Sequence, residues 1–460
     1  MRKKLFLAVL LVSLPSLFGL ASAAEETLKI KYLSRIQEPA WAWGSEAGVY
    51  VHQKKLYIPL GYPGFAIYDI SRPDKPVRLK VMSSFELGGQ AGPVAVRGSR
   101  AYLALPDQSA IAVIDVSNPS RPAVLTRFSV AQGVQQLQIR GSYLYVQGGS
   151  SIQNEGGIFA FDLSKETPAP AGQYTKDLID PGFLITGTGM VFLARTPAHA
   201  TDSAKIDCVD MSRPDKPVLK SQWASTYPGN IFDIDMNGTR LFCAAYWGGI
   251  WVLDASDVTS LKLAALYDWT RREPYSKSIR AVFPYVFLAQ GGPVMADQKF
   301  AEYKVSGDGL RLIQEIPAST YTHSVSRAGE LLFLIEQESP WGNSYPQKII
   351  RVYRIETALL APTQVSLRRR INRSLFFQEA VHTISWQPNP GNAGTAVSGY
   401  RVYRKPAGGN DDEYILRGAV SGSTLSYVDP RLKMSQEFEY VVTAVDREGL
   451  ESPFSLSVKN

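Results

Sequence analysis

One short phrase returns along most of the chain at a nearly constant interval, and it constrains the fold more than any other feature. Its fullest form, Asp-Ile-Ser-Arg-Pro-Asp-Lys-Pro, begins at Asp69 and recurs with small changes from Asp115 and Asp210. Shorter copies begin at Asp162 and Asp254, so the five aspartates lie 46, 47, 48 and 44 residues apart. Self-similarity at a fixed period of this size is typical of repeat architectures. Two degenerate copies follow, with a basic residue in place of the aspartate at Lys304 and Arg354.

Each repeat predicts four short strands. In the second repeat these are residues 94–96, 102–105, 111–115 and 123–128, which contain β-branched and aromatic residues and are separated by turn residues such as Gly98-Ser99. Four-stranded units with a period of about 45 residues are typical of propeller blades. The repeats therefore predict an all-β chain whose main domain is a seven-bladed β-propeller.

The two ends of the repeat region predict how such a ring closes. The last repeat reaches 351–355 and has no fourth strand before the pattern stops. The segment 28–33, Leu-Lys-Ile-Lys-Tyr-Leu, supplies a spare strand at the other end. We expect residues 27–37 to complete the seventh blade, because closure removes two free sheet edges.

The repeat phrase carries a family resemblance. The pattern D-[IVM]-S-x-P-x-x-P, preceded by a G-x-x-x-[YF]-[LVF]-A strand, resembles the LVIVD-repeat propellers of bacterial and archaeal surface proteins, over about residues 27–357. The resemblance implies the propeller fold. It implies no particular activity, because that family has no common assigned one.

A second module follows the repeats. Residues 358–364 are predicted to be a linker, and residues 365–460 resemble a fibronectin type III β-sandwich. The resemblance rests on Ile384-Ser385-Trp386, Gly399-Tyr400-Arg401-Val402-Tyr403 and the late strand from Glu439. It implies that Trp386 is the core tryptophan. Phe438 stands where that family usually has the tyrosine of its corner hydrogen bond.

The N-terminus has the three-part pattern of a secretory signal peptide. A basic start at 2–4 precedes the apolar run 5–12 and the small residues Ala21-Ser22-Ala23. We expect cleavage after Ala23, with a propeller domain over 24–357, although a short membrane anchor is the alternative. Removing the three basic residues from 49 Lys+Arg leaves 46 against 42 Asp+Glu. We therefore expect an exported bacterial protein, periplasmic, cell-surface or secreted, with no membrane span after cleavage and no nucleic-acid partner.

The repeat alignment indicates where a partner would bind. Long connections enter the innermost strands on one face of the ring, whereas the opposite face has only tight turns, and functional residues favour long loops on a rigid scaffold. Polar residues that begin innermost strands should converge at the channel mouth on that face, either to bind a ligand or merely to bind channel water. Nearby loop aromatics favour interfaces. The candidate binding residues are Gln136, Asp233, Lys277, His323, Tyr246, Trp247 and Trp43.

Sharper chemical motifs are missing from the sequence. The segment from Asp233 to Gly238 mimics the start of a calcium loop, but its twelfth position is Ala244 instead of glutamate. The four histidines show no zinc spacing, and no G-x-S-x-G elbow occurs. We therefore expect no catalytic set, no metal and no cofactor. Cys208 and Cys243 are expected to be buried thiols in preference to a disulfide, and the arginine-rich run that ends at Arg373 is expected to be a solvated loop, with contact to anionic polymers as the alternative.

Three hypotheses for function follow. The first is a non-enzymatic binding scaffold that docks a protein or a glycan on the long-loop face, with the C-terminal module as spacer or second contact. The second is a metal-dependent or acid–base lyase or hydrolase acting on a polysaccharide through Asp233, Lys277 and His323 at the channel mouth. The third is a structural component of an envelope assembly.

Overall fold

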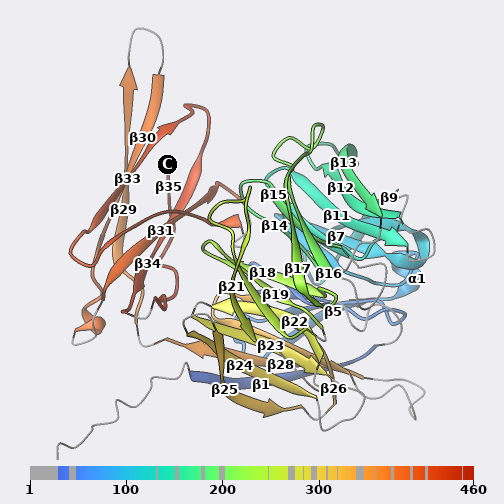
Figure 1. Ribbon diagram of the computed structural model, residues 1–460. Coiled ribbons are helices and arrows are strands. Elements are labelled where there is room, and N and C mark those ends of the chain that lie inside the picture. Colours follow the sequence, from blue (N-terminus) through green and yellow to red (C-terminus); the bar gives the residue numbers. More distant parts are fainter. Residues whose placement is uncertain are drawn as a thin grey trace, which may run out of the picture.

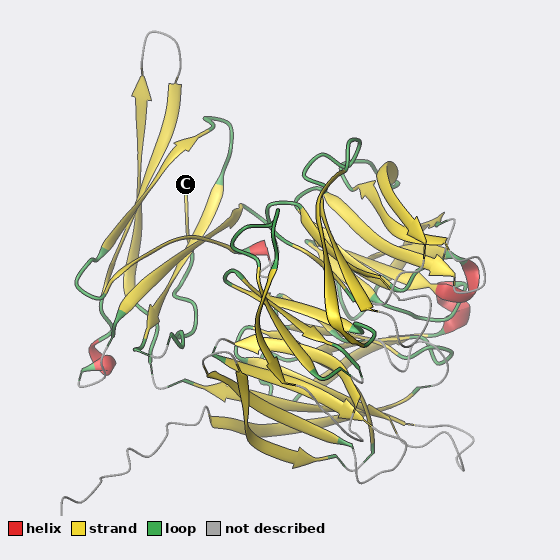
Figure 2. Cartoon of the chain, viewed as in Figure 1, coloured by secondary structure: helices red, strands yellow, loops and turns green. Residues whose placement is uncertain are grey.

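The computed structural model is almost entirely β-structure (Figure 2). Helix in its described part consists of α1 (Ser84–Leu87), the two 3-10 turns Pro106–Gln108 and Pro390–Asn392, and the single 3-10 residue Glu413. No helix among the described residues is long and apolar enough to cross a membrane. The residues described are 29–40, 48–130, 133–150, 155–177, 182–195, 203–246, 248–267, 275–282, 284–291, 298–306, 309–318, 320–337, 347–357, 359–373, 378–393, 397–409, 413–447 and 449–460.

The first four repeats each form a four-stranded antiparallel sheet whose strands follow one another in sequence, as predicted. The strands are β2 (Tyr50–His52), β3 (Lys55–Pro59), β4 (Phe65–Asp69), β5 (Val77–Met82), β6 (Val94–Arg97), β7 (Arg100–Leu105), β8 (Ala110–Asp115), β9 (Ala123–Ser129), β10 (Gln136–Arg140), β11 (Tyr143–Ser150), β12 (Glu155–Asp162), β13 (Ala169–Asp177), β14 (Phe183–Ile185), β15 (Met190–Arg195), β16 (Ser203–Asp210) and β17 (Val218–Pro228).

The next two repeats are joined in one eight-stranded sheet, but a single parallel bridge between Leu266 and Gly309 links its two four-stranded halves. The last sheet takes three strands from the end of the repeat region and one from its start. The strands are β18 (Asp233–Asn237), β19 (Arg240–Ala244), β20 (Ile250–Asp254), β21 (Lys262–Tyr267), β22 (Tyr275–Val282), β23 (Tyr285–Gly291), β24 (Lys299–Ser306), β25 (Gly309–Pro317), β26 (Tyr321–Ala328), β27 (Leu331–Gln337), β28 (Gln347–Glu356) and β1 (Lys29–Pro39).

The sheets form a closed ring. The first strand of each repeat contacts the first strands of its neighbours, in the cyclic order β2, β6, β10, β14, β18, β22, β26 and back to β2. Strand β1 pairs antiparallel with β28 from Lys29↔Glu356 to Pro39↔Gln347, which confirms the predicted closure by the N-terminal strand (Figure 1). The innermost strands thus surround a common centre.

The repeat phrase forms a turn at the end of the third strand, stabilised by its aspartate. The carboxylate of Asp69 accepts a hydrogen bond from the backbone N–H of Ser71 at 2.8 Å, and Asp115 does the same with Ser117 at 2.8 Å. Such a side chain ends a strand because it supplies the local backbone with a partner outside the sheet. These bonds hold the pKa of both carboxyl groups below the ordinary value.

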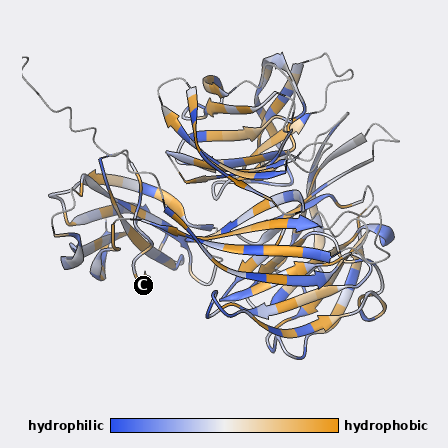
Figure 3. Cartoon of the chain, turned by 90° about the horizontal axis from the view of Figure 1, so that it is seen from below, coloured by the Kyte–Doolittle hydropathy of each residue, from blue (hydrophilic) through white to orange (hydrophobic). Residues whose placement is uncertain are grey.

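Apolar residues pack between neighbouring sheets. Hydrophobic and hydrophilic positions are mixed along the strands (Figure 3). The second and third strands of a repeat, however, are buried along nearly their whole length, so each sheet presents apolar side chains to the sheets on either side. One such cluster joins Phe192 and Cys208 of the fourth repeat to Leu241, Cys243 and Trp251 of the fifth. Both cysteines are free thiols and are fully buried, as expected from the sequence.

The C-terminal module is a two-sheet sandwich of a three-stranded sheet, β29-β30-β33, and a four-stranded sheet, β32-β31-β34-β35. Trp386 is buried in its core, with its ring centroid 5.4 Å from that of Tyr400 on the facing sheet. The strands are β29 (Thr363–Arg373), β30 (Gln378–Gln387), β31 (Gly399–Pro406), β32 (Ile415–Ser421), β33 (Ser426–Leu432), β34 (Phe438–Val445) and β35 (Val458–Lys459).

Strand β29 corrects two expectations. It begins at Thr363, inside the segment 358–364 that was predicted to be a linker, and it contains the arginine-rich run that was predicted to be a loop. The sequence gives little sign of this strand, because only Val365 and Leu367 alternate as apolar residues before the arginines. Both of these residues pack against the sandwich core.

The sandwich contacts the ring on the tight-turn face. The backbone N–H of Gly141, in the turn between β10 and β11, donates to Glu413 Oε2 at 3.1 Å. Leu450 of the sandwich is buried in a cluster with Val282 and Tyr285, which flank the turn between β22 and β23. Neither of these two contacts lies on the long-loop face of the ring.

Candidate functional site

The structure separates the predicted polar residues of the channel mouth. Gln136 and Asp233 begin their innermost strands, as predicted, whereas Lys277 and His323 are each the third residue of theirs. Lys277 Nζ donates to the carbonyl oxygen of Thr322 at 3.0 Å, so Lys277 and His323 lie together. Gln136 lies apart from them, because β14 and β18 separate β10 from β22 in the ring. Trp43 and Trp247 lie outside the described residues.

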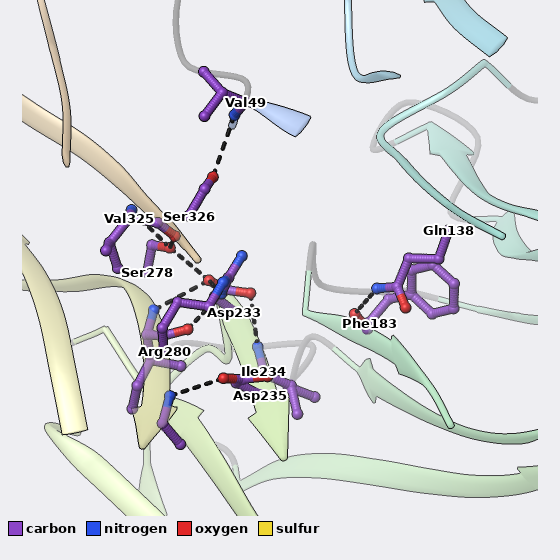
Figure 4. A network of polar contacts seen from close by, with 12 residues as sticks. Val49, Gln138, Phe183, Asp233, Ile234, Asp235, Ser278, Arg280, Val325 and Ser326 are labelled. Atoms are coloured by element: carbon purple, nitrogen blue, oxygen red, sulfur yellow. Dashed lines mark hydrogen bonds and ion pairs between the residues drawn. The ribbon is translucent and has the colours of Figure 1, made fainter. Parts of the chain in front are cut away.

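Asp233 is a clamp between two innermost strands. Its Oδ2 atom accepts hydrogen bonds from Ser278 Oγ at 2.6 Å, the Ile279 N–H at 3.1 Å and Arg280 Nη1 at 2.6 Å (Figure 4). Its Oδ1 atom accepts from the N–H of Ile234 at 2.9 Å. The side chain is buried and both of its oxygens are engaged, so Asp233 holds β18 to β22.

The same kind of contact continues along the ring. Asp235 Oδ2 accepts from the Ala281 N–H at 2.8 Å, and Arg327 Nη1 donates to the Ala281 carbonyl oxygen at 2.9 Å. Ser326 Oγ accepts from the Val49 N–H at 3.2 Å, across the point of closure (Figure 4). Burial raises the pKa of Asp235, which Arg280 and Arg327 partly offset. Burial would lower the pKa of Arg280, but the attraction of Asp233 and Asp235 outweighs it and raises that pKa.

Lys277 and His323 occupy equivalent irregularities in neighbouring strands. The register between β22 and β23 shifts between Ser276 and Ser278, and that between β26 and β27 shifts between Thr322 and Ser324. Lys277 and His323 are the extra residues of these two bulges. A bulge re-aims its side chain and is common beside functional sites. The sequence alignment placed both residues in the same column but contained no signal of the bulges.

His323 is uncharged at neutral pH. Burial lowers its pKa to about 3, with the charges of Lys277 and Lys348 acting in the same direction. Lys348 is buried and its Nζ donates to the Pro59 carbonyl oxygen at 2.9 Å. The neutral imidazole has one N–H donor and one nitrogen acceptor, and its surroundings are positively charged.

Three aromatic rings stack beside this pair. Tyr246 lies between Phe232 and Tyr275, with ring centroids 4.6 and 4.5 Å away. All three are half-buried, and Tyr275 is two residues before Lys277. The predicted Tyr246 is thus part of a row that leads toward Lys277. Sequence reasoning missed Phe232, although its place directly before Asp233 was a signal.

Buried polar groups surround the bulges. The Thr322 N–H and Oγ donate to Gln298 Oε1 at 2.9 and 3.0 Å, and Gln290 Nε2 donates to Tyr303 Oη at 2.9 Å. Gln290 is 1% exposed, and its Oε1 atom has no hydrogen-bond partner in the described part of the chain. A buried polar atom of this kind marks a place for a water molecule or a ligand.

The geometry offers little to a resident metal. Within the residues that the structure describes, no group of three His, Cys, Asp or Glu side chains could hold an ion. The segment that mimics a calcium loop is the β18–β19 hairpin, with Gly238 at a φ of 61° in its turn. What the site can do chemically is donate hydrogen bonds, present positive charge and pack against a flat partner group.

Comparisons with known proteins support the fold. The family described as LVIVD repeat matches residues 88–130, which span the second repeat. The WD40 β-propeller domain of Doa1 has a similar structure, with a TM-score of 0.51 and 10% sequence identity over 71% of this chain and 98% of that one. The ring is a β-propeller. No curated protein matches the chain.

Two further solved structures are similar to a lesser degree. BamB from Moraxella catarrhalis has a TM-score of 0.47 and 12% identity over 71% of this chain and 98% of that chain. Saccharomyces cerevisiae Sqt1 has a TM-score of 0.48 and 8% identity over 78% of this chain and 97% of that chain. At these identities none of the three likenesses extends from fold to function.

Proposed function

We propose that this chain is an exported, non-enzymatic binding scaffold that docks a protein or a glycan on the long-loop face of its propeller. The docking surface consists of the aromatic row Phe232–Tyr246–Tyr275 and the pair Lys277–His323. The repeat alignment predicts that Trp43, Trp247 and Gln136 belong to the same face. Export follows from the signal-peptide pattern of residues 1–23, and the working place is the periplasm, the cell surface or the medium.

The propeller has seven blades in this proposal. The eight-stranded sheet counts as two blades, because one bridge joins its halves and each half runs through four consecutive strands. The sandwich is a fibronectin type III domain. Its support is the division into β29-β30-β33 and β32-β31-β34-β35 together with the buried Trp386.

The observation that carries the proposal is the state of the polar groups at the channel mouth. Asp233, the carboxylate that an acid–base mechanism would use, has both oxygens occupied by backbone, serine and arginine donors. His323 is neutral and lies next to an ammonium group. A stacked aromatic row beside hydrogen-bond donors favours recognition, because flat rings with polar tips bind with little loss of entropy.

The enzyme hypothesis has weaker support. A general base must be within reach of a substrate proton and have a pKa near the working pH. Asp233 faces Arg280 and Ser278 in the ring, and the pKa of His323 lies far below neutrality. The hypothesis of a passive envelope component predicts a partner that is indifferent to both residues.

The test is capture of a partner from envelope and culture-fluid fractions with the mature chain, followed by a binding titration with the partner identified. Tyr246→Ala/His323→Ala is the test variant, and Ser99→Ala/Ser142→Ala on the tight-turn face is the control. We expect the control to bind as the unchanged chain does and the test variant to bind at least about tenfold more weakly. Equal binding by both variants would reject the long-loop face as the docking surface.

A further inference from the structure

The sandwich concentrates positive charge on one of its two sheets. Asp429, one of two acidic residues in the strands β29, β30 and β33, is buried and paired with Arg404 of the facing sheet at 2.7 Å. The other is Glu379, which accepts a hydrogen bond from Asn372 at 3.2 Å. Six exposed basic residues lie on this sheet or directly after it, namely Arg368, Arg369, Arg370, Arg373, Arg431 and Lys433.

These six charges are not neutralised by direct ion pairs in the described part of the chain, and Glu379 is reached from Arg370 only through Asn372. In the part of the chain that the structure describes, none of the six takes part in an ion pair. Arg369 donates to the Met434 carbonyl oxygen at 2.8 Å, and Arg370 donates to Asn372 Oδ1 at 3.1 and 2.8 Å. The contacts fix two guanidinium groups in place without cancelling their charge, which prepares them for an anionic partner.

The geometry of β29 sets the arginines in a row. Val365 and Leu367 pack inward, so Arg368 and Arg370 project from the outer face of the sheet. Alternate residues of a strand are roughly 6.7 Å apart. Thr383 lies opposite Arg368 on the neighbouring strand. Ser366 pairs with Ser385, two residues away along each strand. The outer face therefore combines guanidinium groups with hydroxyl groups.

This face points away from the propeller. The sandwich residues that meet the propeller, Glu413 and Leu450, flank strands of the other sheet. Figure 1 shows β29, β30 and β33 on the side of the sandwich that is farther from the ring. The basic sheet is thus independent of the proposed docking face and stays accessible when that face is occupied.

We propose that the outer face of β29-β30-β33 binds an anionic polysaccharide, through Arg368 and Arg370 to its charged groups and through the serine and threonine hydroxyls to its sugar hydroxyls. Charge complementarity selects a polyanion. The outer face carries no aromatic side chain among its described residues, whereas proteins that bind single-stranded nucleic acid stack bases on such rings. The face also presents no cluster of large apolar side chains of the kind that enters a lipid surface.

The experiment measures binding of the full mature chain to dextran sulfate and to polygalacturonate, with neutral dextran as the uncharged reference. The test variant is Arg368→Gln/Arg370→Gln. The control variant is Lys75→Gln/Arg121→Gln, which removes the same charge from exposed turns of the propeller. Each is compared at low and at physiological salt, and thermal melting checks that the variants are folded.

We expect both anionic polymers to bind, neutral dextran not to bind, and the test variant to lose roughly tenfold or more in affinity. The control variant should stay within about twofold, and the affinity of the unchanged chain should fall steeply with salt. Equal losses by both double variants would overturn the proposal, because net charge alone would then explain binding. Tighter binding to anionic phospholipid vesicles or to duplex DNA than to either polysaccharide would overturn the ligand class.

Discussion

The first five repeats and the last two differ in where they keep their polar groups. In the first five, an aspartate ends the third strand and accepts a serine N–H at 2.8 to 3.1 Å, on the surface of the molecule. In the last two, Lys304 and Arg354 replace that aspartate, while buried polar residues gather inside. Those buried residues include Ser276, Ser278, Gln290, Gln298, Glu302, Thr322, Glu336 and Lys348.

The innermost strands differ in the same way. Strands β2, β6, β10, β14 and β18 pair regularly with their neighbours, whereas β22 and β26 each contain a bulge. The regular repeats build a stiff ring from local turn chemistry. The sixth and seventh repeats bury polar groups in their interior, which lowers their stability. Such departures are characteristic of functional regions.

The largest loss of stability is expected where the first five repeats meet the last two, at the contact between β18 and β22. Replacing Asp233 by alanine leaves Arg280 and Ser278 without their acceptor inside the ring, and loss of one partner of such a pair costs about 3 kcal/mol. Urea unfolding of the Asp233→Ala chain should show a correspondingly lower midpoint. Asp233→Asn, which keeps the shape and one carbonyl acceptor, should lose less. Equal stability of Asp233→Ala and the unchanged chain would mean that the clamp does not join the two parts.

The second effect is a pH dependence that belongs to the irregular part. Glu302 is 1% exposed, and burial raises its pKa to about 7, while its hydrogen bond from Gln314 acts in the opposite direction. Between the ordinary glutamate pKa and about pH 7, Glu302 is therefore protonated in the folded chain and ionised in the unfolded chain. The stabilisation is complete below the ordinary glutamate pKa and is lost as the pH rises through about 7, by roughly 3 kcal/mol in total.

Glu302→Gln should remove this dependence, so the variant should be the more stable chain above about pH 8 and differ little near pH 5. Unfolding midpoints of both chains across that range provide the measurement. Their difference isolates Glu302, because the histidines and the surface aspartates titrate alike in both chains. A difference that does not change with pH would contradict the assignment.

The smallest effect is expected in the regular part. Asp115→Ala removes the acceptor for the Ser117 N–H at the end of β8, and loss of a comparable capping contact costs about 1 kcal/mol. Thermal melting should show a small decrease. Lys304→Ala, at the equivalent position of an irregular repeat, should change the melting temperature less, since no turn acceptor is lost there. A loss at Asp115 as large as that at Asp233 would erase the distinction between the two parts.

Much of the scaffold was predictable because it depends on local rules. Three features can each be recognised from a few neighbouring residues: the recurrent turn phrase, the pattern of apolar residues and the spare strand at 28–33. The strands and the closure by β1 follow from them. The prediction for the run ending at Arg373 was wrong because its arginines interrupt the alternation of apolar residues, whereas the pairing of β29 with β30 continues through them.

The candidate site was only partly predictable. Aligning the repeats found Asp233, Lys277 and His323 as one column, yet the structure gives Asp233 a structural contact and bonds Lys277 to Thr322, next to His323. In that alignment Ser278, Asp235 and Arg280 lie one, two and three columns later, so the residues of the clamp do not share a column. No sequence signal distinguishes a bulged position from a regular one.

The sequence by itself determined the repeat unit, its strands and the order in which they pair, because turn chemistry and two-residue alternation act over short distances. The tertiary structure alone decided which polar side chains meet. Asp233 and Arg280 are 47 residues apart in sequence and touch only because β18 and β22 lie side by side in the ring. Contacts of that range depend on the register of whole strands, and a shift of one residue turns a side chain to the opposite face.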